Sequence, residues 1–273
     1  KINQPPYISV ARQEFCKPDR TNLPSLRSYA HLLTAGSKKI SGYTEASRGC
    51  QHYCKHCPIV PVYRGKFRVV QKEVVLQDIQ QQIDAGAEHI TFGDPDFFNG
   101  PGHAMRIVQS VAEMYSGVTY DITVKVEHIR KHKDLIPRLA ETGCLFVTTA
   151  VESFDDNVLK HLSKGHSRAD IIQAVNICRA VGMNISPTFV AFTPWTTPES
   201  YLDLLQQIVS LELVPHVAPI QLTIRLLVPL GSHILQTESF SPFLESYNDE
   251  SLSYGWRYEK SATVELEQKV KSI

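Results

Sequence analysis

The alternation of short apolar runs with longer helical patterns is the feature that most constrains the fold of this 273-residue chain. It is typical of βα units arranged around a parallel sheet. Strands are expected at residues 40–46, 89–93, 122–127, 145–151, 184–192 and 219–227. Helices are expected at residues 72–85, 102–114, 133–142, 155–162, 168–181 and 197–211. We therefore predict an α/β protein with one core of six βα units, from about residue 40 to residue 235.

Residues that favour helix ends support this assignment. Gly86, Gly143 and Gly182 each follow a helical run and precede a strand, where a left-handed residue is most easily supplied by glycine. Thr197, which a proline follows, and Asp155 are of the types that cap helix N-termini.

Two of the expected strands alternate between polar and apolar residues, as the two-residue period of a strand requires for two different faces. The polar positions are Thr123, Lys125 and Glu127 in one strand, and Gln221, Thr223 and Arg225 in the other. If helices cover the apolar outer face, the polar face lines an internal cavity. Arg225 is then the foremost inward cation and Lys125 the next, and a buried guanidinium needs an anionic partner.

Composition excludes several classes of protein. Lys plus Arg and Asp plus Glu number 28 each, so no overall field favours nucleic acid. No apolar run approaches the roughly 20 residues of a membrane span, and the first residues lack the order of a signal peptide. We expect a cytoplasmic protein without a nucleic-acid or membrane partner.

Half of the six cysteines lie in the stretch SRGCQHYCKHCPIV, as Cys50-x3-Cys54-x2-Cys57. The stretch follows the first expected strand, at the carboxyl end where parallel α/β sheets place ligands. Of the other three cysteines, Cys144 and Cys178 have apolar neighbours and are expected to be buried thiols, whereas Cys16 is uninformative. The cluster of thiols predicts a metal site.

Two kinds of metal site remain open for these thiols. Structural zinc takes four ligands, and His52 and His56 offer a fourth, although both belong to the same short loop. A zinc-binding interaction module is therefore one alternative. A [4Fe-4S] cluster held by three thiolates instead leaves one iron free for a small molecule.

The cysteine triplet in this position resembles that of the radical S-adenosylmethionine (radical SAM) superfamily, over roughly residues 40–230. The resemblance implies a partial (β/α)6 TIM-like barrel at residues 40–235, with an N-terminal extension at 1–39. A C-terminal extension at 236–273 is expected to cover the barrel mouth. It also implies a [4Fe-4S] cluster on Cys50, Cys54 and Cys57, whose free iron binds S-adenosylmethionine and whose electron cleaves it.

The resemblance assigns further residues to the cofactor. His56 matches a position near adenine, with a solvated loop histidine as the alternative. The run TFGDPDFFNGPGH resembles the motif that binds the methionyl amino group, here with Gly93, Asp94, Pro95 and Asp96, so that either aspartate or only backbone carbonyls make the contact.

Later strands supply the remaining expected contacts. Glu152 and Ser153 match a pair near the ribose or methionyl part. Residues 164–166 match the Lys-Gly-His turn that often follows, with an ordinary surface turn as the alternative. Backbone groups from Val190 to Phe192 are expected under adenine. Arg225 is expected to meet a carboxylate of S-adenosylmethionine or substrate.

Three stretches, HCPIVPVYRGKFRVV, GDPDFFNGPGH and LTIRLLVPLGS, resemble a group of radical SAM proteins that often carry a Cys- or selenocysteine-Ala-Glu-Pro tail. Such a tail is either missing here or trimmed from the sequence. Some members transfer the 3-amino-3-carboxypropyl group of S-adenosylmethionine to arsenite in arsinothricin formation, which makes arsenite the expected substrate. A conventional 5'-deoxyadenosyl radical enzyme acting on a small metabolite or peptide is the alternative.

Radical SAM chemistry implies an electron donor such as flavodoxin or ferredoxin. The basic residues Arg64, Lys66 and Arg68 just after the cysteines form either a docking patch for such a donor or an ordinary solvated face.

Overall fold

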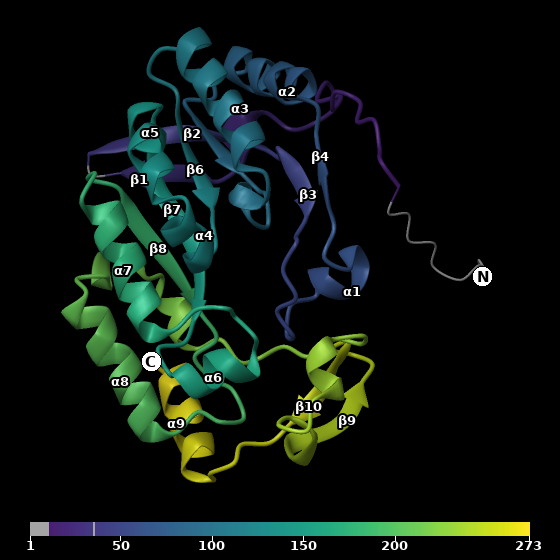
Figure 1. Ribbon diagram of the computed structural model, residues 1–273, viewed down its shortest axis with the longest axis vertical. Helices are drawn as coiled ribbons and strands as arrows, with labels where there is room; N and C mark the ends of the chain where they lie inside the picture. Colours follow the sequence, from purple (N-terminus) through teal and green to yellow (C-terminus); the bar gives the residue numbers. More distant parts are fainter. Residues whose placement is uncertain (1–10, 35) are drawn as a thin grey trace.

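The computed structural model describes residues 11–34 and 36–273. Its main feature is a six-stranded sheet in the order β1-β2-β5-β6-β7-β8. The strands are β1 (His31–Thr34), β2 (Ser37–Thr44), β5 (His89–Phe92), β6 (Thr119–Thr123), β7 (Cys144–Glu152) and β8 (Asn184–Phe189). β1 pairs with β2 in antiparallel fashion, and the remaining neighbours are parallel. The sheet curls into part of a barrel, which confirms the predicted fold class (Figure 1).

The described part of the chain forms α-helices, several of which pack on this sheet. The helices are α1 (Ile59–Tyr63), α2 (Lys72–Asp84), α3 (Pro101–Met114), α4 (Val126–Lys131), α5 (Ile136–Glu141), α6 (Asp156–His161), α7 (Arg168–Arg179), α8 (Pro198–Ser210) and α9 (Ala262–Lys271). Figure 1 shows α2 and α3 at one end of the sheet and α7 and α8 at the other. Fully buried side chains such as Ile90, Ile122 and Val147 fill the space between the layers.

The expected helix ends are confirmed. Gly86, Gly143 and Gly182 all have positive φ angles. Thr197 forms a capping box with Ser200 at the start of α8. The carboxylate of Asp155 accepts a hydrogen bond from the amide of Asn157 at the start of α6.

The structure corrects two of the expected strands. β6 ends at Thr123 and α4 begins at Val126, so Lys125 is an N-cap and Glu127 a helical residue rather than strand positions. The run 219–227 is not a strand: Pro219–Leu222 is a 3-10 helix, and an isolated parallel bridge joins Phe192 to Arg225.

Local hydrogen bonds explain the second correction. The amides of Gln221 and Thr223 donate to the carbonyls of Ala218 and Ile220, which are turn contacts. The side-chain oxygen of Gln221 accepts from the Phe189 amide of β8, where a sixth strand would have supplied a carbonyl. A side chain thus supplies the hydrogen-bond acceptor at this edge of the sheet, and the polar alternation in residues 219–227 does not indicate a strand.

The regions outside the barrel contain short elements. The predicted N-terminal extension holds the 3-10 helix Leu26–Ser28 and β1, while its residues 1–10 and 35 lie outside the described residues. The predicted C-terminal extension holds β9 (Leu244–Asn248), β10 (Ser253–Trp256) and α9.

The remaining 3-10 helices of the described residues are Phe97–Asn99, Lys133–Leu135, Val214–His216, His233–Gln236 and Ser241–Phe243. Among the described residues, none of the helices is both long and apolar enough for a membrane crossing.

Candidate functional site

The three clustered cysteines lie in a loop between β3 (Ser47–Gly49) and β4 (Phe67–Val69), which pair with each other. Gly49 enters this loop with a φ of +87°, and an added Cβ would stand 2.4 Å from the Tyr63 ring and 2.6 Å from the Lys66 carbonyl. Glycine is therefore required here both for backbone conformation and for space.

The same loop is tied to two distant segments. The Lys55 amide donates to the carbonyl of Leu162 at the end of α6. The Lys55 carbonyl accepts from the Ser232 hydroxyl at 3.1 Å and from the Ile234 amide at 2.9 Å. These contacts hold the cysteine loop over the carboxyl end of the sheet.

The loop carries three thiols that differ in burial. Cys54 is buried, and Cys50 and Cys57 are partly buried. Burial, together with the neighbouring thiols and Asp96, raises the pKa of Cys50 to about 11. Burial also raises the pKa of Cys57. Such thiols deprotonate at neutral pH when a cation takes the place of the proton.

A charged network lies beside the thiols. Oε1 of Glu152 is 3.1 Å from Nε2 of His56 and 3.1 Å from Nζ of Lys164. Burial opposes ionisation of Glu152, yet Lys164 and His56 lower its pKa to about 2. Burial likewise opposes the charge on Lys164, but Glu152 and the Cys54 thiol raise its pKa above the usual value. The network places a buried lysine charge next to the thiols.

Backbone strain accompanies this network. Glu152 ends β7 with a φ of +66°, at an irregularity in the pairing of β7 with β8. The left-handed region is rare for a side chain other than Gly, Asn or Asp, and such strain is found most often at functional sites. The strained turn directs the carboxylate toward the cysteine loop.

The two aspartates after β5 have different roles. Asp94 accepts hydrogen bonds from the Ala46 amide at 2.9 Å and the Ser47 hydroxyl at 2.6 Å, so both of its oxygens are occupied by the chain itself. Burial raises the pKa of Asp94 to about 6 despite these bonds. An added Cβ at Gly93 would lie 1.8 Å from the Tyr43 hydroxyl, so the exposed Tyr43 side chain would have to move.

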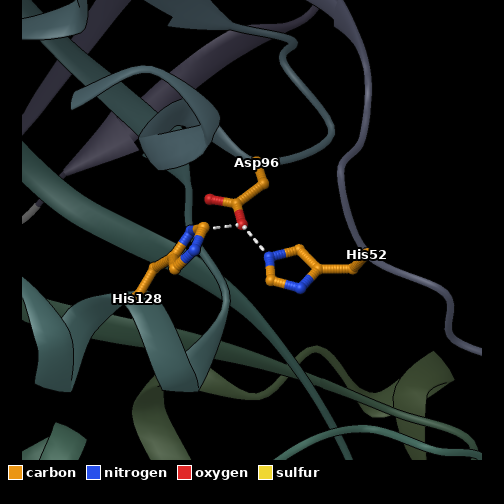
Figure 2. Close-up of side chains that lie close together, drawn as sticks. All are labelled: His52, Asp96 and His128. Carbon is orange, nitrogen blue, oxygen red and sulfur yellow. Dashed lines mark ion pairs between the residues drawn. The ribbon is translucent and has the colours of Figure 1, made fainter. Parts of the chain in front are cut away.

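Asp96, unlike Asp94, points toward two histidines (Figure 2). Its Oδ2 lies 2.8 Å from Nδ1 of His128 in α4 and 3.3 Å from Nε2 of His52 in the cysteine loop. Its Oδ1 accepts from the Phe98 amide at 3.1 Å. Burial opposes ionisation, but the two imidazoles lower the pKa of Asp96.

Lys125 lies at the same edge, where it precedes α4 and is 7% exposed. Its Nζ is 3.4 Å from Oε2 of Glu127, which faces Gly165 of the turn after α6. Lys125 is thus brought to the carboxyl edge from a helix N-cap, not from a strand.

Other predicted site residues are engaged within the chain. The Ser153 hydroxyl accepts from the Asp155 amide. The Val190 amide donates to the Glu152 carbonyl, and the Phe192 backbone pairs with Ile224 and with Leu226. The adenine contacts expected of residues 190–192 and the ribose or methionyl contact expected of Ser153 stay predictions.

Arg225 is directed to the C-terminal extension. Its guanidinium lies 3.7 Å from the Trp256 ring centroid and 3.1 Å from Oε2 of Glu267 in α9. The anion that the sequence requires for Arg225 is therefore available from the chain itself. A contact with the cofactor stays a prediction.

Sequence reasoning did not assign a site role to His128 or Lys164, and it placed Glu127 only on the polar face of an expected strand. Lys164 had a signal, because it opens the Lys-Gly-His turn. His52 had been weighed only as a fourth ligand to the thiols. His128 had no signal, since a histidine in an ordinary helical pattern shows nothing of the partner that the fold brings to it.

The radical SAM superfamily model matches residues 44–208, which is more than half of the chain and includes the cysteine loop and the carboxyl edge of the sheet. The chain belongs to the radical SAM superfamily, whose members use a [4Fe-4S] cluster and S-adenosylmethionine.

Two relatives of this chain are named as a methylase and as a tRNA-modifying synthase. The chain is 22% identical to the hopanoid C-2 methylase of Rhodopseudomonas palustris (strain TIE-1), over 70% of this chain and 37% of that protein. It is 25% identical to the tRNA-2-methylthio-N(6)-dimethylallyladenosine synthase of Desulfitobacterium hafniense (strain Y51), over 65% and 42%. The chain therefore spans about two fifths of the length of these relatives.

Solved structures share the fold. The cobalamin-dependent S-adenosylmethionine radical enzyme OxsB matches with a TM-score of 0.68 at 15% identity, over 83% of this chain and 40% of that chain. The radical S-adenosylmethionine methyltransferase TsrM from Kitasatospora setae matches with a TM-score of 0.57 at 16% identity, over 64% and 35%. These matches place the described sheet among partial barrels of the radical SAM type.

Proposed function

We propose that this chain is a radical SAM transferase whose [4Fe-4S] cluster is held by Cys50, Cys54 and Cys57. The observation that supports it is the grouping of three thiols in one loop over the carboxyl edge of the sheet, beside a buried lysine. When bound, the cluster supplies the electron that cleaves a carbon–sulfur bond of S-adenosylmethionine.

The donor set fits such a cluster. Three soft thiols within eight residues leave one iron without a protein ligand, and that iron is the place for a small molecule. Lys164 offsets part of the negative charge that the thiolates bring. Its partner Glu152 keeps the lysine in place, and His56 holds the same carboxylate oxygen from inside the cysteine loop.

The chain also holds the cysteine loop from two sides. Asp94 joins the end of β5 to the segment after β2, which fixes the loop entrance relative to the sheet. The Lys55 contacts hold the opposite side of the loop. Exclusion of water from this edge would protect a reactive species from quenching.

The finer proposal is that the 3-amino-3-carboxypropyl group is transferred to arsenite. Its support is the sequence resemblance described above. Cys144 starts β7, whereas Glu152 ends it, so that eight residues of strand, roughly 25 Å, separate this thiol from the cysteine loop. Arsenite would therefore be held by groups other than Cys144.

Product analysis tests the proposal. Anaerobically reconstituted protein is incubated with dithionite and S-adenosylmethionine, with and without arsenite. An arsenite-dependent rise in 5'-methylthioadenosine, with a carbon–arsenic product, supports aminocarboxypropyl transfer. 5'-Deoxyadenosine supports the conventional radical reaction, and S-adenosylhomocysteine supports methyl transfer. Protein that holds a cluster but yields none of these products contradicts the transferase proposal.

A further inference from the structure

We propose that His52, Asp96 and His128 form a second metal site, for one divalent transition-metal ion of the zinc or ferrous class, next to the cysteine loop (Figure 2). Each residue offers one ligand atom, and the three atoms lie within 4.8 Å of one another. The site uses nitrogen and oxygen ligands only and is distinct from the three thiols.

Two of the three separations fit a common ion. Ligands at about 2.0–2.1 Å from a metal, with angles of about 90–110°, stand roughly 2.9–3.4 Å apart. The observed separations from Oδ2 of Asp96 are 2.8 Å to Nδ1 of His128 and 3.3 Å to Nε2 of His52. Two imidazoles and one carboxylate are a donor set used by both zinc and non-haem iron.

Hydrogen bonding does not account for the arrangement. All three ligand atoms are buried, yet none has a hydrogen-bond partner of normal geometry. Such atoms normally have partners when buried. Within the described part of the chain, no lysine or arginine forms an ion pair with Asp96, which is 0% exposed. A bound cation would give the buried ligand atoms a partner and would balance the charge of Asp96.

The surroundings resemble those of metal-binding histidines, whose second ring nitrogen usually meets a carboxylate or carbonyl oxygen. Nδ1 of His52 lies 3.8 Å from Oε2 of Glu127. Nε2 of His128 lies 3.1 Å from the side-chain amide of Gln51, and a half-turn of that amide presents its oxygen. Nδ1 of His128 then keeps its lone pair for the ion.

The site has a place for a further ligand. Asp96 and His128 are closed off by the core, whereas the His52 side chain is 14% exposed. Three protein ligands leave at least one coordination position for water or for an oxygen of a bound substrate. Because His52 stands between Cys50 and Cys54, the ion would also tie the cysteine loop to β5 and α4.

Zinc is a suitable probe, because elemental analysis separates it from cluster iron. Full-length protein with a reconstituted cluster is equilibrated with zinc, passed over a weak chelator and assayed for both metals. We expect one zinc per chain in the wild type and at least a tenfold loss of affinity in His52→Ala and in His128→Ala, with iron content unchanged. His132→Ala is the matched control, since its ring lies 5.7 Å from that of His128 but contributes no ligand.

Zinc K-edge absorption gives a readout independent of activity and of iron content. Only nitrogen and oxygen at about 2.0–2.1 Å supports the site, whereas sulfur at about 2.3 Å means that zinc occupies the thiols and overturns it. The inference is also overturned if the wild type binds no zinc, or if the histidine variants retain it. Protein that binds zinc through nitrogen and oxygen but never binds a cluster refutes the proposed function and leaves this inference standing.

Discussion

Replacement of Glu152 by Gln tests the charged network beside the thiols. The change keeps the shape of the side chain but leaves Lys164, which is 3% exposed, without its carboxylate. Removal of one partner from a buried ion pair costs about 3–5 kcal/mol. The pKa of Glu152 gives a similar magnitude, because a fall from 4.5 to about 2 corresponds to roughly 3 kcal/mol at neutral pH.

The assay is urea unfolding of cluster-free protein at pH 7 under anaerobic conditions. We expect Glu152→Gln to lower the free energy of unfolding by about 3 kcal/mol. Lys164→Met removes the lysine charge instead, and the double variant should recover at least about 2 kcal/mol relative to the sum of the two single changes. Additive effects, or a loss below about 0.5 kcal/mol for Glu152→Gln, would refute the coupling.

The pH dependence of the same variants follows from the direction of the shift. The pKa of Glu152 is lowered in the folded chain, so its contribution to stability is present above the unfolded value of 4.5 and is lost as the pH falls toward 2. The difference in free energy of unfolding between the wild type and Glu152→Gln should therefore shrink as the pH falls between these values. A constant difference across that range would contradict the assigned cause.

Three further changes have expected outcomes. Gly49→Ala should lower the free energy of unfolding in urea by about 2 kcal/mol or more. Gly117→Ala should lower it by only about 1 kcal/mol, because Gly117 has a similar positive φ but open space around it. Equal losses would exclude the overlap of a Cβ at position 49 with the Tyr63 ring and the Lys66 carbonyl. Arg225→Ala should lower stability by about 1 kcal/mol through lost contacts with Glu267 and should leave S-adenosylmethionine affinity in equilibrium dialysis unchanged; the reverse pattern would favour the cofactor role. The pKa of Asp94 is raised to about 6, so wild-type stability should fall relative to that of Asp94→Asn as the pH rises from 4 to 6, and parallel curves would contradict this.

The fold was largely predictable because its signals are local. Apolar periodicity and helix-end residues such as Gly143 and Thr197 act within a few positions of the chain. The run 219–227 was misread because its alternation satisfied the pattern of a strand, while the partner that decides its structure is the distant Phe189 amide. Tertiary contacts overrode the local signal.

The site was predictable in part for the same reason. The spacing of the cysteines is a local signal, and so is a carboxylate such as Glu152 at the end of an apolar strand. The approach of His52 to His128 joins residues 76 positions apart, and nothing in either segment reports the other. For Arg225, sequence reasoning correctly required an anionic partner but did not reveal that Glu267 is that partner.

Iron and sulfide content after anaerobic reconstitution tests the central claim most directly. The account predicts about four irons per chain in the wild type and in Cys16→Ala, with less than about one in Cys50→Ala, Cys54→Ala and Cys57→Ala. Addition of S-adenosylmethionine should alter the electron paramagnetic resonance spectrum of the reduced cluster. Colourless protein with a single zinc on the thiols, or loop variants that retain four irons, would contradict the account.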